Sequence, residues 1–189
     1  ITNDINIGNK NPNNVILTGP NAGGKSTFIK SITISLLFAQ TVGISFSESL
    51  EITPFTFINT HLNIPDCKGK ESLFEAEMHR ARDHLNKLDE LDNAFSFVVM
   101  DEIFSSTNPE EGISGAYAIA EKIADNNNSI ALITTHFSYL TKLEESQKFC
   151  NYKIPIGRDK DNNIDYLYKL EKGISKQFIA LELLKNKGF

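Results

Sequence analysis

Tryptophan is absent from this chain of 189 residues, which also contains only two cysteines, two methionines and six prolines. The cysteines, Cys67 and Cys150, lie far apart and have no CxxC spacing or paired histidines near them. The sequence therefore predicts neither a disulfide framework nor a zinc site, and it fits a reducing compartment.

Long apolar runs and basic charge are also scarce. No stretch approaches the roughly 18 apolar residues of a membrane-spanning helix, and the first residues lack the layout of a signal peptide. We therefore expect a soluble intracellular protein, in the cytoplasm or in the nucleoid or nucleus, that does not engage a membrane. With 19 Lys and Arg against 24 Asp and Glu, the net charge of −5 predicts no basic surface for nucleic acid.

The composition is that of a packed globular domain, with 40% hydrophobic, 10% aromatic and 23% charged residues. No internal repeat or Gly/Ser linker divides the chain, so we expect one domain over residues 1–189. The chain begins at Ile1 and its first residues already fit an ordered element, so we expect a fragment from the C-terminal part of a longer protein.

Short apolar runs alternate with segments of helical periodicity, which favours an α/β fold with a mostly parallel central sheet flanked by helices. The pattern predicts buried strands at 15–17, 95–100 and 130–134, and helices at 25–39, 72–91 and 109–124. It also predicts additional β segments at 51–60, 152–156 and 164–170, a turn at 159–163, a loop at 62–70 and a last helix at 177–187.

The sequence also predicts where the helices begin and which of their faces are buried. Apolar residues occur around helix 25–39, so we expect it to be buried on most sides. Ser72 and Glu75 form the pattern of a capping box, and Asn108 before Pro109 predicts another helix start. One face of helix 72–91 is predicted to be apolar, through Phe74, Met78, Ala81, Leu85 and Leu88.

The strongest motif lies between the first strand and the first helix, where residues 19–26 match the phosphate-binding pattern GxxxxGK[ST]. In such a loop, backbone N–H groups and the helix dipole face the phosphates, Lys25 neutralises β/γ charge, and Ser26 ligates Mg²⁺. A glycine-rich turn before an ordinary helix is the alternative. The predicted nucleotide contacts are Gly19, Pro20, Asn21, Ala22, Gly23, Gly24, Lys25, Ser26 and Thr27.

A second motif, Asp101-Glu102, ends the strand 95–100. Ligands of parallel sheets bind at this edge, so Asp101 is predicted to hold Mg²⁺ and Glu102 to orient the attacking water. Two acids that merely solvate a loop are the alternative, and the phosphate-binding loop upstream favours the catalytic interpretation. His136 closes a further strand and is predicted to reach the γ-phosphate, although a lone histidine is more often structural.

Taken in this order and spacing, residues 19–27, 101–102 and 134–137 resemble the ATPase domain of the MutS mismatch-recognition family, which belongs to the ABC superfamily. Residues 72–78 resemble the serine-led signature of that family, and residues 173–176 with the last helix resemble the end of its core. The likeness covers nearly the whole chain. It implies a P-loop NTPase fold of ABC-ATPase type.

The resemblance also implies an ATPase motor that uses ATP and Mg²⁺. ATP in this family lies between two protomers of a homodimer or MutS-like heterodimer, and DNA is bound by other domains. Ser72 is therefore implied to contact the γ-phosphate of the partner, with a plain N-cap as the alternative. Asn3 and Tyr168 lie where the family contacts adenine, although Tyr168 also fits a cross-strand aromatic.

Three departures from the family pattern accompany these matches. Ala22 stands where mismatch-repair members usually have Met, and residues 103–108 replace a Gly-Arg-Gly-Thr-Ser-Thr-like stretch. The segment after Gly173 is one residue short. Because the phosphate and magnesium residues are intact, the resemblance implies a divergent MutS-like protein.

Two other functions remain open. A non-catalytic nucleotide-gated clamp would bind ATP with negligible hydrolysis, and the intact Asp101 and Glu102 argue against it. Another ABC-type ATPase of chromosome maintenance should contain long coiled-coil insertions, and none interrupts this sequence. A transporter is disfavoured because no Leu-Ser-Gly-Gly-Gln-like signature precedes helix 72–91.

Overall fold

The computed structural model describes residues 1–62, 72–91, 94–160 and 163–176. Within them lies a six-stranded sheet in the order β2-β3-β4-β1-β5-β8, in which only β5 and β8 pair antiparallel. Its strands are β1 (Asn14–Thr18), β2 (Phe57–His61), β3 (Ser96–Asp101), β4 (Ser129–Thr134), β5 (Phe149–Lys153) and β8 (Glu171–Lys172). A separate hairpin joins β6 (Ile156–Arg158) to β7 (Ile164–Tyr166).

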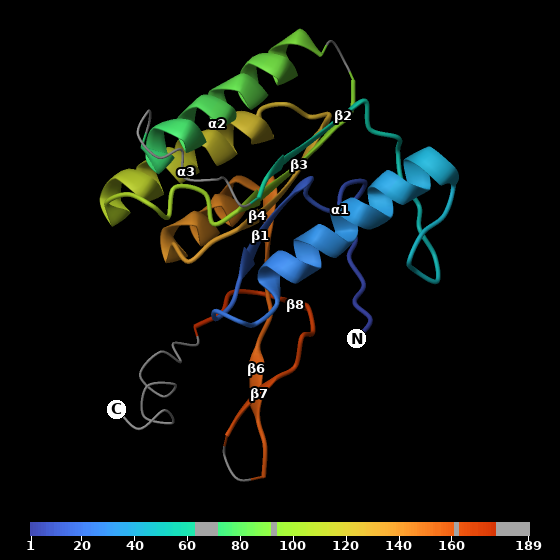
Figure 1. Cartoon of the computed structure of the whole chain (residues 1–189), viewed down its shortest axis with the longest axis vertical. Helices are drawn as coiled ribbons and strands as arrows, with labels where there is room; N and C mark the ends of the chain where they lie inside the picture. The colour runs from blue at the N-terminus through green and yellow to red at the C-terminus, as the bar shows by residue number, and fades with distance from the viewer. Residues whose placement is uncertain (63–71, 92–93, 161–162, 177–189) are drawn as a thin grey trace.

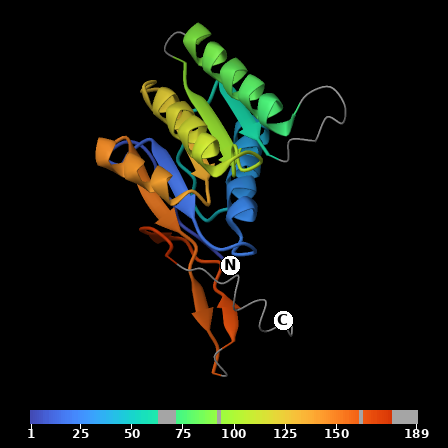
Figure 2. The ribbon, with the colours of Figure 1, turned by 90° about the vertical axis from the view of Figure 1, so that its left-hand side faces the viewer.

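Helices cover both faces of the sheet, as Figures 1 and 2 show. They are α1 (Lys25–Val42), α2 (Leu73–Glu90), α3 (Pro109–Ala124) and the 3-10 helix η1 (Ser138–Ser146). α1 packs on one face, and α2, α3 and η1 pack on the other. The predicted α/β fold with a mostly parallel sheet is confirmed. None of the described helices is both long and apolar enough to cross a membrane.

The middle residues of the central strands are apolar, as expected for strands whose two faces are both buried. In β3, Val98 and Met100 face the cluster formed with α2 and α3, whereas Phe97 and Val99 face the cluster formed with α1. The same alternation occurs in β1 and β4. Because parallel strands all end at one edge, the residues that follow β1, β3 and β4 are brought together there.

The expected burial of the first helix on most sides is wrong. Ile29 and Leu36 are buried in α1, but Ile34, Leu37 and Phe38 are each more than 40% exposed. Only one side of α1 lies against the sheet, so the apolar residues on its other side stay at the surface. The helix also runs beyond residue 39 to Val42, and Gly43 ends it in the left-handed region with φ 71°.

Several strand limits differ from the prediction. β2 begins only at Phe57, because Phe55 after Pro54 pairs its backbone with the side chain of Gln40 rather than with a strand. β5 occupies 149–153 instead of 152–156, and β7 ends at 166 instead of 170. The helix η1 was not anticipated. The loop predicted at 62–70 lies outside the described residues except for its first residue, and the helix at 177–187 lies outside them entirely.

The helix starts agree with the prediction. Glu75 N–H donates to Ser72 Oγ at 3.2 Å, and Ser72 N–H donates to Glu75 Oε2 at 3.0 Å, so the capping box is confirmed. Asn108 caps α3 by accepting from Glu110 N–H at 2.9 Å. The predicted apolar face of α2 is wrong at Met78, which is 48% exposed, because the buried face of α2 is the one that carries Glu77, Ala81, His84 and Leu88.

Two buried histidines between β2 and α2 make the stability of the protein pH-dependent. His61 and His84 have ring centroids 6.1 Å apart, and Asn59 hydrogen-bonds Nδ1 of His84 at 3.1 Å. Burial lowers the pKa of each histidine to about 4, and the charge of Arg80 adds to this effect at His61. Both rings are therefore held neutral in the folded protein.

When a histidine has a lower pKa in the folded protein than in the unfolded chain, the folded protein becomes less stable as pH falls from the unfolded-state pKa to the folded-state pKa. The free energy of unfolding should therefore be lower at pH 5 than at pH 7, by roughly 2 kcal/mol for each of these histidines. Urea unfolding across this range measures the loss. The variant His61→Leu should show a smaller loss, and an identical pH slope in both proteins would contradict the assignment.

Candidate nucleotide-binding site

The loop between β1 and α1 presents the unpaired start of a helix. Gly24 is the N-cap residue, its φ is 95°, and a Cβ there would lie 3.0 Å from Cδ1 of Tyr168. The positive φ favours glycine there, and a Cβ would also crowd the ring of Tyr168. No side chain caps α1, and its first turn contains no acid. The backbone N–H groups and the positive dipole end are consequently available to an anion.

Lys25 folds back over this loop and is only 4% exposed. Its Nζ donates to the carbonyl oxygens of Gly19 at 3.0 Å and Pro20 at 3.3 Å, and it lies 3.4 Å from Oε1 of Glu102. The ammonium group therefore lies between the phosphate-binding loop and the acid that follows β3. This position suits a cation that neutralises phosphate charge.

Asp101 and Glu102 are held by a residue that the sequence analysis placed in a motif but gave no role. Thr134, at the end of β4, pairs in register with Asp101 at the end of β3. Its hydroxyl donates to Asp101 Oδ1 at 2.6 Å and accepts from the N–H of Glu102 at 3.0 Å. The available signal was its position two residues before His136, at the end of the neighbouring predicted strand.

Glu102 is the point at which the predicted catalytic side chains meet. Nε2 of His136 lies 2.6 Å from Oε1 of Glu102, the same oxygen that Lys25 approaches. The hydrogen bond from His136 lowers the pKa of Glu102 most, the charges of His136 and Lys25 lower it further, and burial opposes them. The carboxylate therefore stays ionised and can accept a hydrogen bond from a water molecule. Glu102 also adopts a positive φ of 53°.

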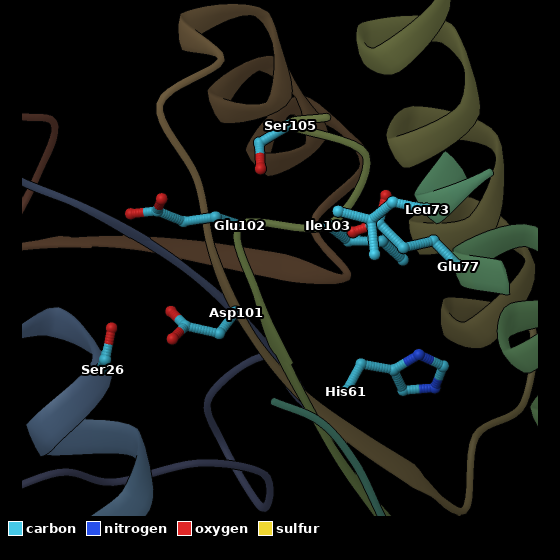
Figure 3. Close-up of a pocket in the computed structure, with 8 residues that line it drawn as sticks. All are labelled: Ser26, His61, Leu73, Glu77, Asp101, Glu102, Ile103 and Ser105. Atoms are coloured by element: carbon cyan, nitrogen blue, oxygen red, sulfur yellow. The ribbon is translucent and has the colours of Figure 1, made fainter. Parts of the chain in front are cut away.

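Two cavities flank these residues. A cavity of about 410 Å³ lies over the loop, with Lys25, Glu102 and Tyr168 in its walls. A second, of about 340 Å³, is lined by Ser26, His61, Leu73, Glu77, Asp101, Glu102, Ile103 and Ser105, and Figure 3 shows it. In that view, the side chains of Ser26 and Asp101 face each other from α1 and β3.

Asn3 and Tyr168 are brought together although they are far apart in sequence. The amide of Asn3 donates to the carbonyl oxygen of Tyr168 at 3.0 Å and accepts from Leu170 N–H at 2.7 Å. Asn3 therefore fixes the backbone that carries Tyr168 beside the loop. Tyr168 lies beyond β7, with its ring stacked on Tyr166 at 6.0 Å, so it is not a cross-strand residue.

Ser72 stands apart from this group. It is exposed at the start of α2, and in the described part of the chain neither cavity is lined by it. Its hydroxyl and backbone N–H are both engaged with Glu75. Its predicted contact with a nucleotide held by another protomer stays a prediction.

Residues 15–189 match the family model described as MutS domain V. The chain belongs to the MutS family. Three relatives named DNA mismatch repair protein MutS, from Bacteroides fragilis, Fusobacterium nucleatum subsp. nucleatum and Persephonella marina, are 32%, 31% and 33% identical over 192, 190 and 182 residues. The alignments cover 100%, 100% and 95% of this chain but 22%, 20% and 20% of the relatives. The chain thus spans about a fifth of their length.

Family membership confirms the resemblance and the fold class drawn from the sequence. MutS domain V is an ATPase domain, so ATP and Mg²⁺ are the ligands that the family implies. The donor set fits Mg²⁺, which prefers oxygen ligands and retains several waters. Ser26 and Asp101 supply a hydroxyl and a carboxylate, and no described cluster of three His, Cys, Asp or Glu competes as an all-protein metal site.

Proposed function

We propose that this MutS domain V binds ATP with Mg²⁺ and hydrolyses it. The observation that supports the proposal most directly is the convergence of Lys25 and His136 on the ionised carboxylate of Glu102, next to a phosphate-binding loop. A carboxylate kept charged and held in this way is suited to accept a hydrogen bond from water and so to orient it for attack.

Each side chain has a distinct role in the proposed reaction. Glu102 orients the attacking water, and His136 braces Glu102 and reaches toward the γ-phosphate. Lys25 stabilises the charge that develops on the transferred phosphoryl group. Ser26 and Asp101 hold Mg²⁺, which when bound neutralises charge on the β- and γ-phosphates.

The proposal also assigns residues to the adenine base and to the nucleotide of a partner protomer. Tyr168 stacks on the base from the rim of the larger cavity, with its backbone held by Asn3. Ser72 contacts the γ-phosphate bound by a second protomer, because the N-terminus of α2 favours an anion and Ser72 is exposed there. The functional unit is then a homodimer or a heterodimer of MutS-like chains.

We also propose that residues 1–189 act as one ATPase domain of a longer DNA repair protein. The relatives carry mismatch repair in their names, and this chain spans about a fifth of each. Its net charge of −5 gives little attraction for DNA, so DNA is contacted by other domains. ATP hydrolysis would reposition these domains.

The proposal is tested by measuring ATP affinity and steady-state phosphate release on the same preparation. Hydrolysis predicts Mg²⁺-dependent release well above background at ATP concentrations that saturate binding. Tight binding without release would favour a nucleotide-gated clamp, which is the second candidate because the binding loop alone suffices for it. Absence of ATP binding would overturn both.

A further inference from the structure

The loop that follows Glu102 is anchored to α2 through Glu77. Oε2 of Glu77 accepts a hydrogen bond from Ser106 Oγ at 2.9 Å, and the backbone of Phe104 also hydrogen-bonds this carboxyl. Glu77 is only 7% exposed, and burial raises its pKa against the opposing effect of the two hydrogen bonds. A buried carboxyl group of α2 therefore satisfies two polar groups of the loop beside the predicted catalytic acid.

Aromatic packing reinforces this connection. Phe104 is 1% exposed, and its ring lies edge-on to that of Phe74 in the first turn of α2, with the centroids 5.4 Å apart. Phe104 also has a positive φ of 60°, an uncommon conformation for a bulky residue. It lies in the segment that departs from the glycine-containing family pattern, so side-chain contacts hold a conformation that glycine would adopt freely.

α3 also packs against Phe104. A Cβ at Gly112 would lie 2.5 Å from the carbonyl oxygen of Phe104, and one at Gly115 would lie 3.0 Å from its ring. Phe104 is thus enclosed between α2 and α3 with little free space. Because Glu102 is only two residues earlier in the chain, a shift of α2 relative to β3 would act on the backbone next to Glu102.

We propose that Glu77 is a positioning residue that couples the placement of Glu102 to the position of α2. α2 begins immediately after Ser72, so Glu77 lies on the helix that follows Ser72 and also bonds to the loop that follows Glu102. Glu102 belongs to this protomer's own site, and Ser72 is the residue proposed to contact the partner's nucleotide. This inference rests on the proposed function and adds a physical link between the two sites of the dimer.

The test compares three variants of the 189-residue chain. Glu77→Ala removes the acceptor, Glu77→Gln keeps one acceptor oxygen, and Asp89→Ala removes an exposed carboxylate from the same helix. Glu77→Ala should lower kcat for ATP roughly tenfold while leaving ATP affinity unchanged, since Glu77 lies outside the phosphate-binding loop. Glu77→Gln should recover most of kcat, and Asp89→Ala should resemble the wild type.

Hydrogen exchange supplies a readout that does not need ATP turnover. The amide of Phe104 should exchange faster in Glu77→Ala and at the wild-type rate in Asp89→Ala. If Glu77→Ala does not fold, Ser106→Ala removes one of the two bonds and should lower kcat roughly threefold. Wild-type kcat together with wild-type exchange in folded Glu77→Ala, or in Ser106→Ala where Glu77→Ala does not fold, would overturn the proposal.

The two proposals fail in different ways. If the wild type neither binds nor hydrolyses ATP, the proposed function is wrong, while exchange at Phe104 still reports whether Glu77 holds the loop. If the wild type is an ATPase and Glu77→Ala keeps its kcat, the proposed function stands and the role of Glu77 is refuted. A parallel loss of ATP affinity and kcat would also refute it, because a positioning role predicts loss of kcat alone.

Discussion

Glu102→Gln is expected to lower the turnover number for ATP by roughly 10²- to 10⁴-fold, the usual contribution of a positioned general base. Glutamine has nearly the same shape, so the variant should bind ATP about as well as the wild type. What it loses is the negative charge that orients the attacking water and that holds His136 at 2.6 Å. Hydrolysis therefore stops at a stage where nucleotide is already bound.

An ATP-bound state that cannot be hydrolysed should accumulate as a dimer. Light scattering or sedimentation with ATP and Mg²⁺ should show a larger dimer fraction for Glu102→Gln than for the wild type, and phosphate release gives the turnover number. Glu48→Gln, at an exposed carboxylate outside both cavities, is the matched control. Unchanged turnover in Glu102→Gln would refute the assigned role.

The contiguous motifs were the part of the site that the sequence could predict. The phosphate-binding loop is a single run of residues whose local conformation is encoded by its own glycines, and Asp101-Glu102 directly follow an apolar strand. Their meeting at one edge follows from the parallel sheet. The residues that hold these acids could not be inferred in the same way, because Thr134 depends on which strand lies beside β3.

Long-range contacts explain the other differences. Periodicity along α1 shows which residues are apolar but not that the sheet covers only one side of them. The pairing of Gln40 with the Phe55 backbone, which replaces strand pairing before β2, joins residues that no local pattern connects. Phe104 is similar, since a buried aromatic with a positive φ is stable only because α2 and α3 enclose it.

Thr134→Val is the second substitution expected to have a large effect on ATP turnover. Its hydroxyl is fully buried and connects the carboxylate of Asp101 to the backbone of Glu102. Valine has the same shape without the hydroxyl, so Thr134→Val removes the bridge while filling the same volume. Oδ1 of Asp101 loses its 2.6 Å partner, whereas the N–H of Glu102 keeps the Thr134 carbonyl oxygen at 3.1 Å.

Loss of this hydrogen bond should therefore weaken the binding of Mg²⁺ by Asp101. A hydrogen bond to a charged group contributes about 1.5–3 kcal/mol, and loss of that contribution in the transition state lowers the turnover number for ATP roughly 10- to 100-fold. The Mg²⁺ concentration for half-maximal rate should rise as well, because Asp101 is no longer held in place. Phosphate release measured across a Mg²⁺ titration gives both quantities.

Thr134→Ser and Thr33→Val separate this role from a general loss of packing. Thr134→Ser keeps the hydroxyl and loses only a methyl group, so its turnover and Mg²⁺ dependence should stay near the wild-type values. Thr33→Val removes another buried hydroxyl, which donates to the Ile29 carbonyl oxygen at 2.8 Å within α1, and should leave both quantities unchanged. Wild-type turnover and Mg²⁺ dependence in Thr134→Val would show that Asp101 and Glu102 hold their positions without this hydroxyl.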